Sequence, residues 1–325
     1  MPTTRTPKVL ISDQMSPKAA EIFRARGIEV DEITGLSKDD LIKIIGNYDG
    51  LAIRSSTKVT KEVLAAATNL KVVGRAGIGV DNVDIPAASA LGVVVMNTPF
   101  GNSITTAEHA IALMFALARQ LPEADASTQA GKWEKNRFMG VEVTAKTLGL
   151  IGAGNIGSIV ADRALGLKMK VIAFDPFPDT AYAAARGIDL VDWNTLLAQS
   201  DWLTLHLPST RESHHLMDAK AFASMKKGAY LINTARGAIV DEKALNAALE
   251  SGHLGGAGLD VFEEEPPGIL PFFHRDNVVL TPHAAGVDEQ SLADMALSAA
   301  QAAVDILAGR LPMEKIVNRD LVRDE

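Results

Sequence analysis

Residues 147–157 have the sequence Thr-Leu-Gly-Leu-Ile-Gly-Ala-Gly-Asn-Ile-Gly, and this stretch decides the fold of the chain. The run 147–151 is typical of a short buried strand, and the apolar residues after Gly157 recur at helical spacing. A strand that continues through Gly-x-Gly-x-x-Gly into a helix is the fingerprint of a dinucleotide-binding site. The stretch therefore predicts one strand–turn–helix unit of a parallel α/β sheet.

The three glycines of this fingerprint have separate tasks. Gly152 permits the tight turn, Gly154 lets the backbone approach a pyrophosphate, and Gly157 allows the helix to pack closely on the strand. The helix N-terminus then offers free N–H groups to the phosphates. Asp175 follows the next apolar run, where a carboxylate accepts hydrogen bonds from ribose hydroxyls and repels a 2′-phosphate. This favours NAD over NADP, and a plain glycine turn beside a surface aspartate is the alternative.

The composition is that of a globular protein with two domains. The chain has 325 residues, 47% of them hydrophobic and 22% charged, and this length exceeds the size at which a single core stops growing. The net charge of -8 argues against a nucleic-acid partner, because binding to phosphates needs a basic field. Since there is no cysteine, redox chemistry has to come from a bound cofactor, and we expect no metal.

The terminal and apolar segments give no sign of a membrane protein. Residues 1–7 lack the pattern of a signal peptide, and no stretch approaches the roughly 20 apolar residues of a membrane helix. We therefore expect a cytoplasmic protein without a membrane partner. A small anionic substrate is compatible with the acidic chain if a few Arg or Lys residues hold it.

Two series of short apolar runs alternate with helical patterns, as in parallel sheets covered by helices. The first series spans residues 8–97, with strands expected at 9–11, 51–53, 72–73 and 93–96. Turn residues at 98–102 indicate a hinge. In the second series we expect strands at 147–151, 170–174, 202–206, 229–233, 258–261 and 277–281, and helices at 105–119, 155–167, 241–251 and 289–308. The fold class is therefore α/β, with two doubly wound parallel sheets.

Three later residues offer the groups of an acid–base site. Arg236 follows the strand 229–233, and a guanidinium at this edge of a sheet can clamp a substrate carboxylate. His283 follows the strand 277–281 and suits proton exchange with a hydroxyl group, because histidine titrates near neutral pH. Glu265, the last of three consecutive glutamates, is favoured as the orienting carboxylate because Pro266 stiffens the chain after it. A surface arginine and solvated glutamates are the alternatives.

Two other histidines and one aspartate have weaker contexts. His109 lies on the apolar helix 105–119, and we expect it to be packed or at an interface. His206 ends a strand shortly before Pro208 and is expected to line the cofactor cleft. Asp260 lies at the end of the strand 258–261, where it would meet the carboxamide of the nicotinamide.

Short motifs also occur outside these sites. They are Gly-Arg-Ala-Gly at 74–77, Val-Asp-Asn-Val-Asp at 80–84, Asn-Thr-Pro at 97–99, Gly-Asn-Ser at 101–103, Gly-Lys-Trp at 131–133 and Phe-Met-Gly at 138–140. Together with the fingerprint and the acid–base segments, they resemble the D-isomer-specific 2-hydroxyacid dehydrogenases over essentially the whole chain. The similarity is greatest to the phosphoglycerate branch of that family.

The resemblance implies a discontinuous arrangement of domains. A flavodoxin-like substrate-binding domain would comprise residues 1–98 and 287–325, and a Rossmann NAD-binding domain, residues 99–286, would be inserted into it. The family is usually dimeric through its cofactor domains. The resemblance therefore implies a homodimer that forms around residues 110–139.

The resemblance also implies roles for individual residues. Arg236 would bind the carboxylate and carbonyl side of the substrate, His283 would be the acid/base, and Glu265 would orient it. Arg54 and Arg75 would lie toward a substrate phosphate. The implied substrate-binding residues are Arg54, Ser55, Arg75, Gly77, Gly79 and Asn102. The implied cofactor-binding residues are Ile78, Gly152, Gly154, Asn155, Ile156, Gly157, Asp175, His206, Leu207, Pro208, Thr234, Ala235, Asp260, Ala285 and Gly286.

Two features depart from the family pattern. Asn155 occupies a fingerprint position where an arginine is common, which removes one potential contact to the cofactor phosphates. The sequence also ends at Glu325 without a serine-sensing regulatory domain, so feedback control of that type is not expected.

The leading hypothesis is the NAD-dependent oxidation of a D-2-hydroxyacid, from 3-phosphoglycerate to 3-phosphohydroxypyruvate, as in serine biosynthesis. A glyoxylate or hydroxypyruvate reductase and a D-lactate-type enzyme are alternatives within the family, and Arg54 and Arg75 discriminate between them. An NAD(H)-sensing, corepressor-like binding protein is the alternative of another class. The sequence leaves open the physiological substrate and direction, the extent of domain closure, effector regulation and any assembly beyond a dimer.

Overall fold

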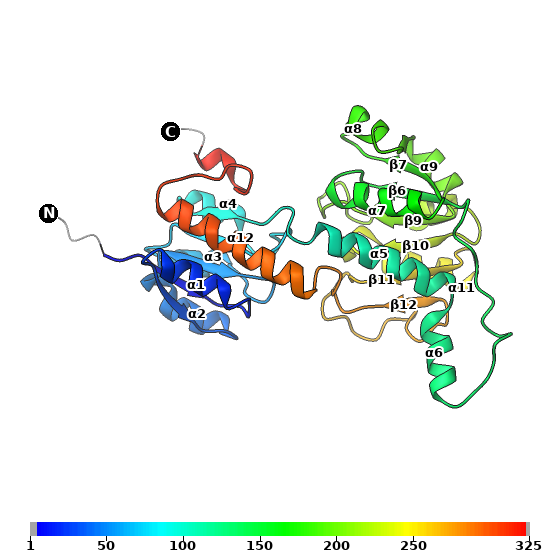
Figure 1. Ribbon diagram of the computed structural model, residues 1–325, viewed down its shortest axis with the longest axis horizontal. Helices are drawn as coiled ribbons and strands as arrows, with labels where there is room; N and C mark the ends of the chain where they lie inside the picture. The colour runs from blue at the N-terminus through cyan, green and yellow to red at the C-terminus, as the bar shows by residue number, and fades with distance from the viewer. Residues whose placement is uncertain (1–4, 323–325) are drawn as a thin grey trace. The chain divides into compact units, whose positions relative to one another are not determined.

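Two parallel sheets account for the fold of the computed structural model, which describes residues 5–322, and each sheet belongs to one unit of the chain (Figure 1). Unit 1 is Met1–Asn102 with Val287–Glu325, and unit 2 is Ser103–Gly286. The chain thus passes from unit 1 to unit 2 after Asn102, at the end of the turn segment 98–102, and not directly after Thr98.

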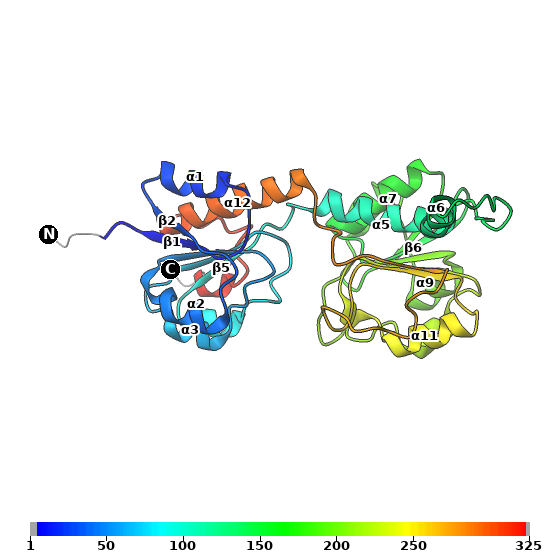
Figure 2. The ribbon, with the colours of Figure 1, turned by 90° about the horizontal axis from the view of Figure 1, so that it is seen from below.

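Unit 1 has five parallel strands in the order β2-β1-β3-β4-β5, which is the flavodoxin-like order. The strands are β1 (Lys8–Ile11), β2 (Glu29–Glu32), β3 (Gly50–Ile53), β4 (Val72–Arg75) and β5 (Val94–Met96). The helices are α1 (Lys18–Ala25), α2 (Lys38–Ile44), α3 (Lys61–Ala66), α4 (Ile85–Ala90) and α12 (Glu289–Leu307), with short 3-10 turns η1 (Ile45–Asn47) and η3 (Arg319–Val322). α1 and α12 cover one face of the sheet, and α2 and α3 cover the other (Figure 2).

The long helix α12 returns from the C-terminal segment to complete unit 1. It begins with a capping box at Asp288 and Ser291. Its inner face presents small residues to the sheet, and Ala303 lies where a Cβ on Gly74 of β4 would make contact. This close approach buries Met96 fully between α12 and the sheet.

Unit 2 has seven parallel strands in the order β12-β11-β10-β9-β6-β7-β8. Counted from β6, this is the Rossmann order 3-2-1-4-5-6 with one further strand. The strands are β6 (Thr147–Ile151), β7 (Lys170–Phe174), β8 (Asp189–Leu190), β9 (Trp202–Leu205), β10 (Tyr230–Asn233), β11 (Gly256–Leu259) and β12 (Val278–Leu280). The helices are α5 (Ser103–Ala118), α6 (Leu121–Gln129), α7 (Asn155–Gly166), α8 (Thr180–Ala184), α9 (Trp193–Gln199), α10 (Ala219–Ser224) and α11 (Glu242–Glu250), with a 3-10 turn η2 (Gly237–Ile239).

The helices of unit 2 also cover both faces of its sheet. α5 and α7 lie on one face, whereas α9 and α11 lie on the other (Figure 2). The prediction of an α/β protein with two doubly wound parallel sheets is therefore confirmed.

One strand of unit 2 differs from its predicted position. β11 is Gly256–Leu259, two residues earlier than the predicted strand 258–261. Its glycines hide the strand pattern, yet they are needed: a Cβ on Gly256 would overlap the carbonyl oxygen of Asn277, and one on Gly258 would crowd Ile232. Asp260 consequently lies just after the strand.

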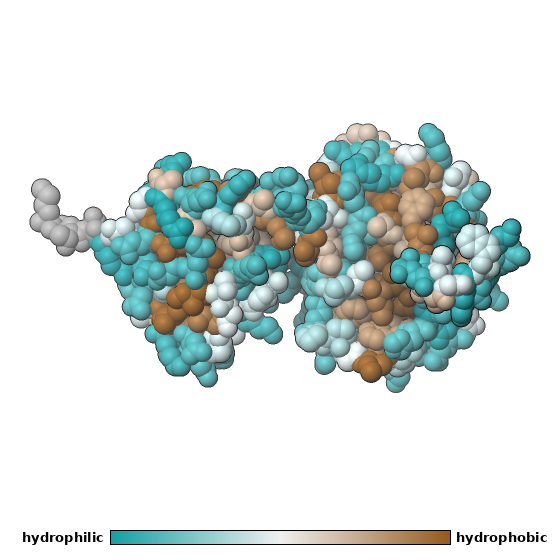
Figure 3. Space-filling view, turned by 60° about the horizontal axis from the view of Figure 1, so that its bottom comes forward, coloured by the Kyte–Doolittle hydropathy of each residue, from teal (hydrophilic) through white to brown (hydrophobic). Residues whose placement is uncertain are grey.

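Unit 2 exposes several large apolar side chains on and after α6. Leu121, Trp133, Met139 and Val141 are all exposed, Trp133 to 85%. Figure 3 shows a face of unit 2 on which apolar residues gather among polar ones. Within residues 5–322, no helix has both the length and the apolar character that a membrane crossing requires.

Candidate active site

The glycine turn after β6 is shaped by close backbone approaches. Gly152 has a φ of 95°, and a Cβ there would overlap the carbonyl oxygen of His206. A Cβ on Gly157 would overlap the carbonyl oxygen of Gly152. Both positions therefore require glycine. Gly154 differs, because a Cβ there would meet no protein atom within 4 Å.

Asp175 holds this turn from the neighbouring strand. It follows β7, and its Oδ2 accepts the N–H of Ala153 at 2.9 Å. Its Oδ1 accepts the N–H of Phe177, also at 2.9 Å. A carboxylate oxygen has two lone pairs, so each oxygen of Asp175 can accept a further hydrogen bond.

His206 follows β9 and lies beside the same turn. Its Nε2 is 3.0 Å from the hydroxyl oxygen of Thr204. Desolvation lowers the pKa of His206 to about 3, so the imidazole is neutral at pH 7. Leu207 and Pro208, which come next, are part-buried and exposed respectively.

Arg236 is placed by a turn that the sequence analysis did not single out. The side chain of Asn233, the last residue of β10, donates to the carbonyl oxygen of Arg236 at 2.9 Å and accepts the N–H of Ala235 at 3.0 Å. Gly237 allows the backbone of Phe262 to approach, since a Cβ there would overlap it. The strand end that carries Arg236 therefore lies against the segment that leads to Glu265. In the sequence, the asparagine at the end of the predicted strand was the one sign of this turn.

Glu265 and His283 meet in this structure although 18 positions separate them. His283 Nδ1 lies 2.6 Å from Glu265 Oε2, and the Phe262 N–H donates to Glu265 Oε1 at 3.1 Å. Partial burial raises the pKa of Glu265, but these hydrogen bonds and the positive charge of Arg236 outweigh it. The net effect is a lowered pKa, so Glu265 is ionised near neutral pH.

The ionised carboxylate decides the tautomer of His283. A carboxylate can only accept hydrogen bonds, so Nδ1 of His283 must carry the proton. In the neutral ring, Nε2 then has the free lone pair. The geometry therefore makes Nε2 a proton acceptor.

Glu263 holds the segment before Glu265 in place. A solvated Glu263 side chain was an alternative from the sequence, but the side chain makes hydrogen bonds within the protein. Glu263 Oε1 accepts the N–H of Glu242, and Glu242 Oε1 accepts the N–H of Glu263, both at 2.9 Å. His215 Nε2 lies 3.1 Å from the other oxygen of Glu263. The segment after β11 is thereby held to the start of α11.

Asp260 holds the segment that contains His283. Its side chain is fully buried, and its carboxylate accepts the N–H groups of Ala284 and Ala285, each at 2.8 Å. In this conformation the carboxylate faces the protein backbone, and the expected contact with a carboxamide stays a prediction.

The expected substrate-binding residues of unit 1 lie at the carboxyl ends of β3, β4 and β5. Arg54 follows β3, and Arg75 is the last residue of the adjacent strand β4. A Cβ on Gly77 would overlap the guanidinium of Arg75, so this guanidinium lies across Gly77. Asn102 is part-buried, and its Oδ1 has no hydrogen-bond partner among the described residues.

Two side chains hold the loop that contains Arg54 and Ser55. Asp13 accepts the N–H of Arg54 at 2.7 Å and the hydroxyl of Thr57 at 2.6 Å. Asn82 donates to the carbonyl oxygens of Arg54 and Thr57, both at 2.7 Å. The carbonyl oxygen of Ile78 accepts from the Asn97 side chain at 2.7 Å, and Gly79 beside it is part-buried.

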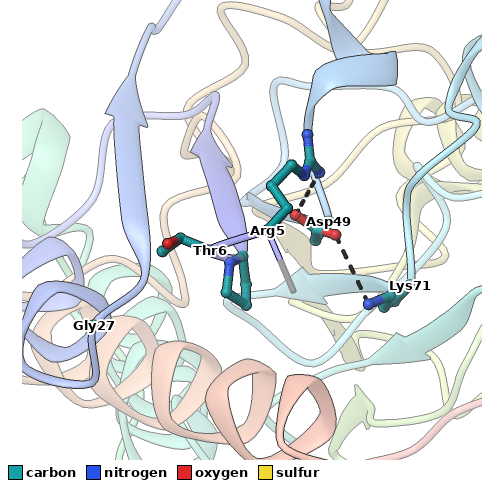
Figure 4. A pocket seen from close by; sticks show the side chains of 6 residues that line it. Arg5, Thr6, Gly27, Asp49 and Lys71 are labelled. Atoms are coloured by element: carbon teal, nitrogen blue, oxygen red, sulfur yellow. Dashed lines mark hydrogen bonds and ion pairs between the residues drawn. The ribbon is translucent and has the colours of Figure 1, made fainter. Parts of the chain in front are cut away.

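A pocket of about 650 Å³ lies at the opposite, amino-terminal edge of this sheet (Figure 4). Arg5 and Lys71 both point toward Asp49 there, at 2.7 and 3.8 Å. These contacts pair its charges within the protein, and none of the expected site residues lines it.

Comparison with known proteins decides the family. The model of the D-isomer specific 2-hydroxyacid dehydrogenase, NAD binding domain, matches residues 111–285, more than half of the chain. The chain belongs to the D-isomer specific 2-hydroxyacid dehydrogenases. Residues 111–285 are therefore an NAD-binding domain, and the predicted cofactor is confirmed.

Individual relatives match nearly the whole length of the chain. A D-3-phosphoglycerate dehydrogenase of Archaeoglobus fulgidus is 46% identical over 96% of the chain. The match takes in 59% of that relative, so the chain spans less than two thirds of its length. Among solved structures, the TT0316 protein of Thermus thermophilus is 36% identical with a TM-score of 0.88, over 95% of this chain and 99% of that one. A D-lactate dehydrogenase of Aquifex aeolicus, complexed with NAD and lactic acid, is 27% identical with a TM-score of 0.85, over 96% and 99%.

The residues around the glycine turn fit a dinucleotide. The N-cap position of α7 is Gly154, which has no side chain to bond the first-turn N–H groups, and they stay open to an anion. The space beside Gly154 is free of protein atoms, and Thr234 Oγ1 is buried without a hydrogen-bond partner among the described residues. Asn155, Ile156 and Gly157 would face the phosphates, and Asp175 the ribose hydroxyls. Residues 5–322 contain no cluster of three or more His, Asp or Glu residues suited to a metal ion.

We predict that Gly154→Ala weakens NAD binding without destabilising the fold. The new methyl group would meet no protein atom but would occupy the space a pyrophosphate needs. Gly166→Ala, in the same helix and also in open space, is the matched control and should bind NAD normally. Tryptophan fluorescence can monitor both the unfolding of each variant in denaturant and its titration with NAD. These two measurements check the predicted stability and the predicted affinity. Equal NAD affinities for the two variants would remove Gly154 from the cofactor site.

We also predict that His206 makes the protein less stable in mild acid. Its pKa is about 3 in the folded state against an ordinary 6.5, so between these values the unfolded chain binds a proton that the folded protein does not. Lowering the pH from 7 to 5 should therefore remove up to about 2 kcal/mol of unfolding free energy. His206→Gln should lose this part of the pH dependence. All three tryptophans lie in unit 2, so their fluorescence measures the unfolding of the unit that contains His206. Identical pH slopes for both proteins would contradict the prediction.

Proposed function

We propose that this protein oxidises a D-2-hydroxyacid with NAD, and that 3-phosphoglycerate, converted to 3-phosphohydroxypyruvate, is its substrate. The 2.6 Å hydrogen bond between His283 Nδ1 and Glu265 Oε2 is the observation that carries the proposal. It leaves Nε2 of His283 as a base for the hydroxyl proton. Bound NAD would supply the hydride acceptor.

The charges around His283 suit this proton transfer. When Nε2 takes the hydroxyl proton, the ring becomes a cation, and the ionised Glu265 at 2.6 Å stabilises it. His283 is half exposed, so a substrate hydroxyl can reach the ring. Arg236 would bind the substrate carboxylate and polarise the carbonyl group that forms at C2 during the oxidation. The three side chains thus divide proton transfer, orientation and anion binding between them.

The substrate assignment rests on relatives and on unit 1. Similar proteins named D-3-phosphoglycerate dehydrogenase are 41–46% identical to the chain over most of its length. Arg54 and Arg75 lie at the carboxyl ends of neighbouring strands, where two guanidinium groups can bind one phosphate. Asp13 and Asn82 would hold the Arg54 loop for that purpose.

A D-lactate-type enzyme is the second candidate, favoured by the similarity to the Aquifex aeolicus D-lactate dehydrogenase. A D-lactate substrate has no phosphate, so it gives Arg54 and Arg75 no phosphate to bind. The preference for NAD over NADP rests on Asp175, whose oxygens each keep a lone pair for a ribose hydroxyl. A homodimer that covers the exposed Trp133 and Met139, and a cytoplasmic location, stay predictions.

His283→Ala should lower kcat about 100-fold or more, because a positioned proton acceptor is lost. The control is His253→Ala, which removes a partly buried histidine of unit 2 that bonds only the Met225 carbonyl in the described contacts. Steady-state assay of both variants with 3-phosphoglycerate and NAD is the measurement. Near-normal turnover of His283→Ala would remove it from the mechanism. A wild-type protein inactive on a whole panel of D-2-hydroxyacids would point to an NAD-sensing binding protein.

Arg75→Ala should raise the KM for 3-phosphoglycerate by roughly tenfold or more, since one charge-assisted hydrogen bond is lost. The kinetics for D-glycerate, which lacks the phosphate, should stay near those of the wild type. Arg5→Ala serves as the matched control, because Arg5 lies at the opposite edge of the same sheet. Unchanged 3-phosphoglycerate kinetics in Arg75→Ala would refute the phosphate assignment and favour the D-lactate-type alternative.

A further inference from the structure

A chain of hydrogen bonds joins α5 to the segment that contains His283. His109, on α5, has its Nε2 3.0 Å from Thr281 Oγ1. The Thr281 hydroxyl in turn donates to Asp260 Oδ1 at 2.6 Å. α5 and β12, the strand before Thr281, both belong to unit 2 (Figure 1). The helix therefore reaches residues 281–285, which we call the acid–base segment, through side-chain hydrogen bonds as well as through packing.

The number of available protons decides which atom donates in each of these hydrogen bonds. A threonine hydroxyl has one proton, and Thr281 gives it to Asp260. Its oxygen can therefore only accept from His109, so Nε2 of His109 must carry a proton. The same N–H nitrogen lies 3.6 Å from Oδ1 of the fully buried Asp260.

Asp260 accepts hydrogen bonds from the backbone N–H groups of three consecutive residues, 283–285. Its carbonyl oxygen accepts the N–H of His283, and its carboxylate accepts those of Ala284 and Ala285, all at 2.8 Å. His283 has a φ of 52°, in the left-handed region that residues other than glycine rarely adopt. A backbone conformation of this kind persists only where its surroundings impose it. The hydrogen bonds of Asp260 hold it here, together with a second one from the His283 N–H to the Thr281 carbonyl oxygen at 3.1 Å.

We propose that His109 is a positioning residue for the acid–base segment. It orients the Thr281 hydroxyl, which holds Asp260, and Asp260 keeps the backbone of residues 283–285 in place. His109 touches none of the reacting groups and acts through these two residues. The inference rests on the proposed function, in which His283 transfers the proton.

The first test uses the ligand-free protein and does not depend on activity. Nitrogen-15 NMR of the histidine side chains distinguishes which ring nitrogen carries a proton, and the signal lost in His109→Gln identifies His109. We expect a proton on Nε2. A neutral ring protonated only on Nδ1 would overturn the proposal, whatever the enzyme catalyses.

The second test compares two replacements of His109. Glutamine keeps an N–H donor near the position of Nε2, whereas leucine has none. We expect His109→Leu to speed the hydrogen exchange of the His283, Ala284 and Ala285 amides and to lower kcat roughly five- to tenfold. His109→Gln should restore both within about twofold. His253→Leu, which removes a histidine hydrogen bond elsewhere in unit 2, should change neither.

A double-mutant cycle with Thr281→Val separates positioning from a general structural role. Because both replacements break one chain, the double variant His109→Leu/Thr281→Val should be no slower than the worse single variant. Independent effects would multiply, and that result would overturn the proposal. If the wild type transfers no hydride while the exchange effects are present, the proposed function fails and the positioning role stands. If His109→Leu keeps both its amide protection and its kcat, the positioning role fails.

Discussion

The parallel direction of every strand is the constraint on which the rest of the structure depends. In a parallel sheet all strands end at one edge, so in unit 2 the chain leaves the sheet at the same edge seven times. Gly152, Asp175 and His206 follow β6, β7 and β9, which are neighbours in the sheet although far apart in sequence. Chemistry at this edge therefore needs no local sequence motif beyond a suitable residue after each strand.

The strands with strong apolar patterns could be predicted from the sequence. β6 and β7 begin and end at the predicted residues, because each is a short apolar run bounded by turn residues. β2 was missed: its sequence Glu-Val-Asp-Glu is polar, which an edge strand tolerates. α6, with little apolar periodicity, was missed for a related reason. The apolar pattern of a helix or strand reflects how much of it is buried. Elements at the edge of a domain, such as β2 and α6, are buried least and therefore show the weakest pattern.

The site could be predicted only in part. Arg236, Glu265 and His283 were singled out because each follows a strand or matches a family motif, and the structure brings Glu265 to His283, while their roles stay predictions. The supporting contacts could not be found in this way. His109 and Thr281 are 172 positions apart, and only the fold brings a polar residue of an apolar helix to that hydroxyl. The one available signal was the histidine itself, which is costly to bury without a partner.

The return of α12 to unit 1 also sets an order of assembly. The helix covers one face of the first sheet, where it buries Met96, but the whole of unit 2 lies between Met96 and α12 in the chain. During synthesis from the N-terminus, unit 2 is complete before the ribosome reaches residue 289, whereas unit 1 still lacks one of the two helices that cover this face of its sheet. An apolar surface on this face of the sheet thus stays open until α12 has been made. Unit 1 is begun first and finished last.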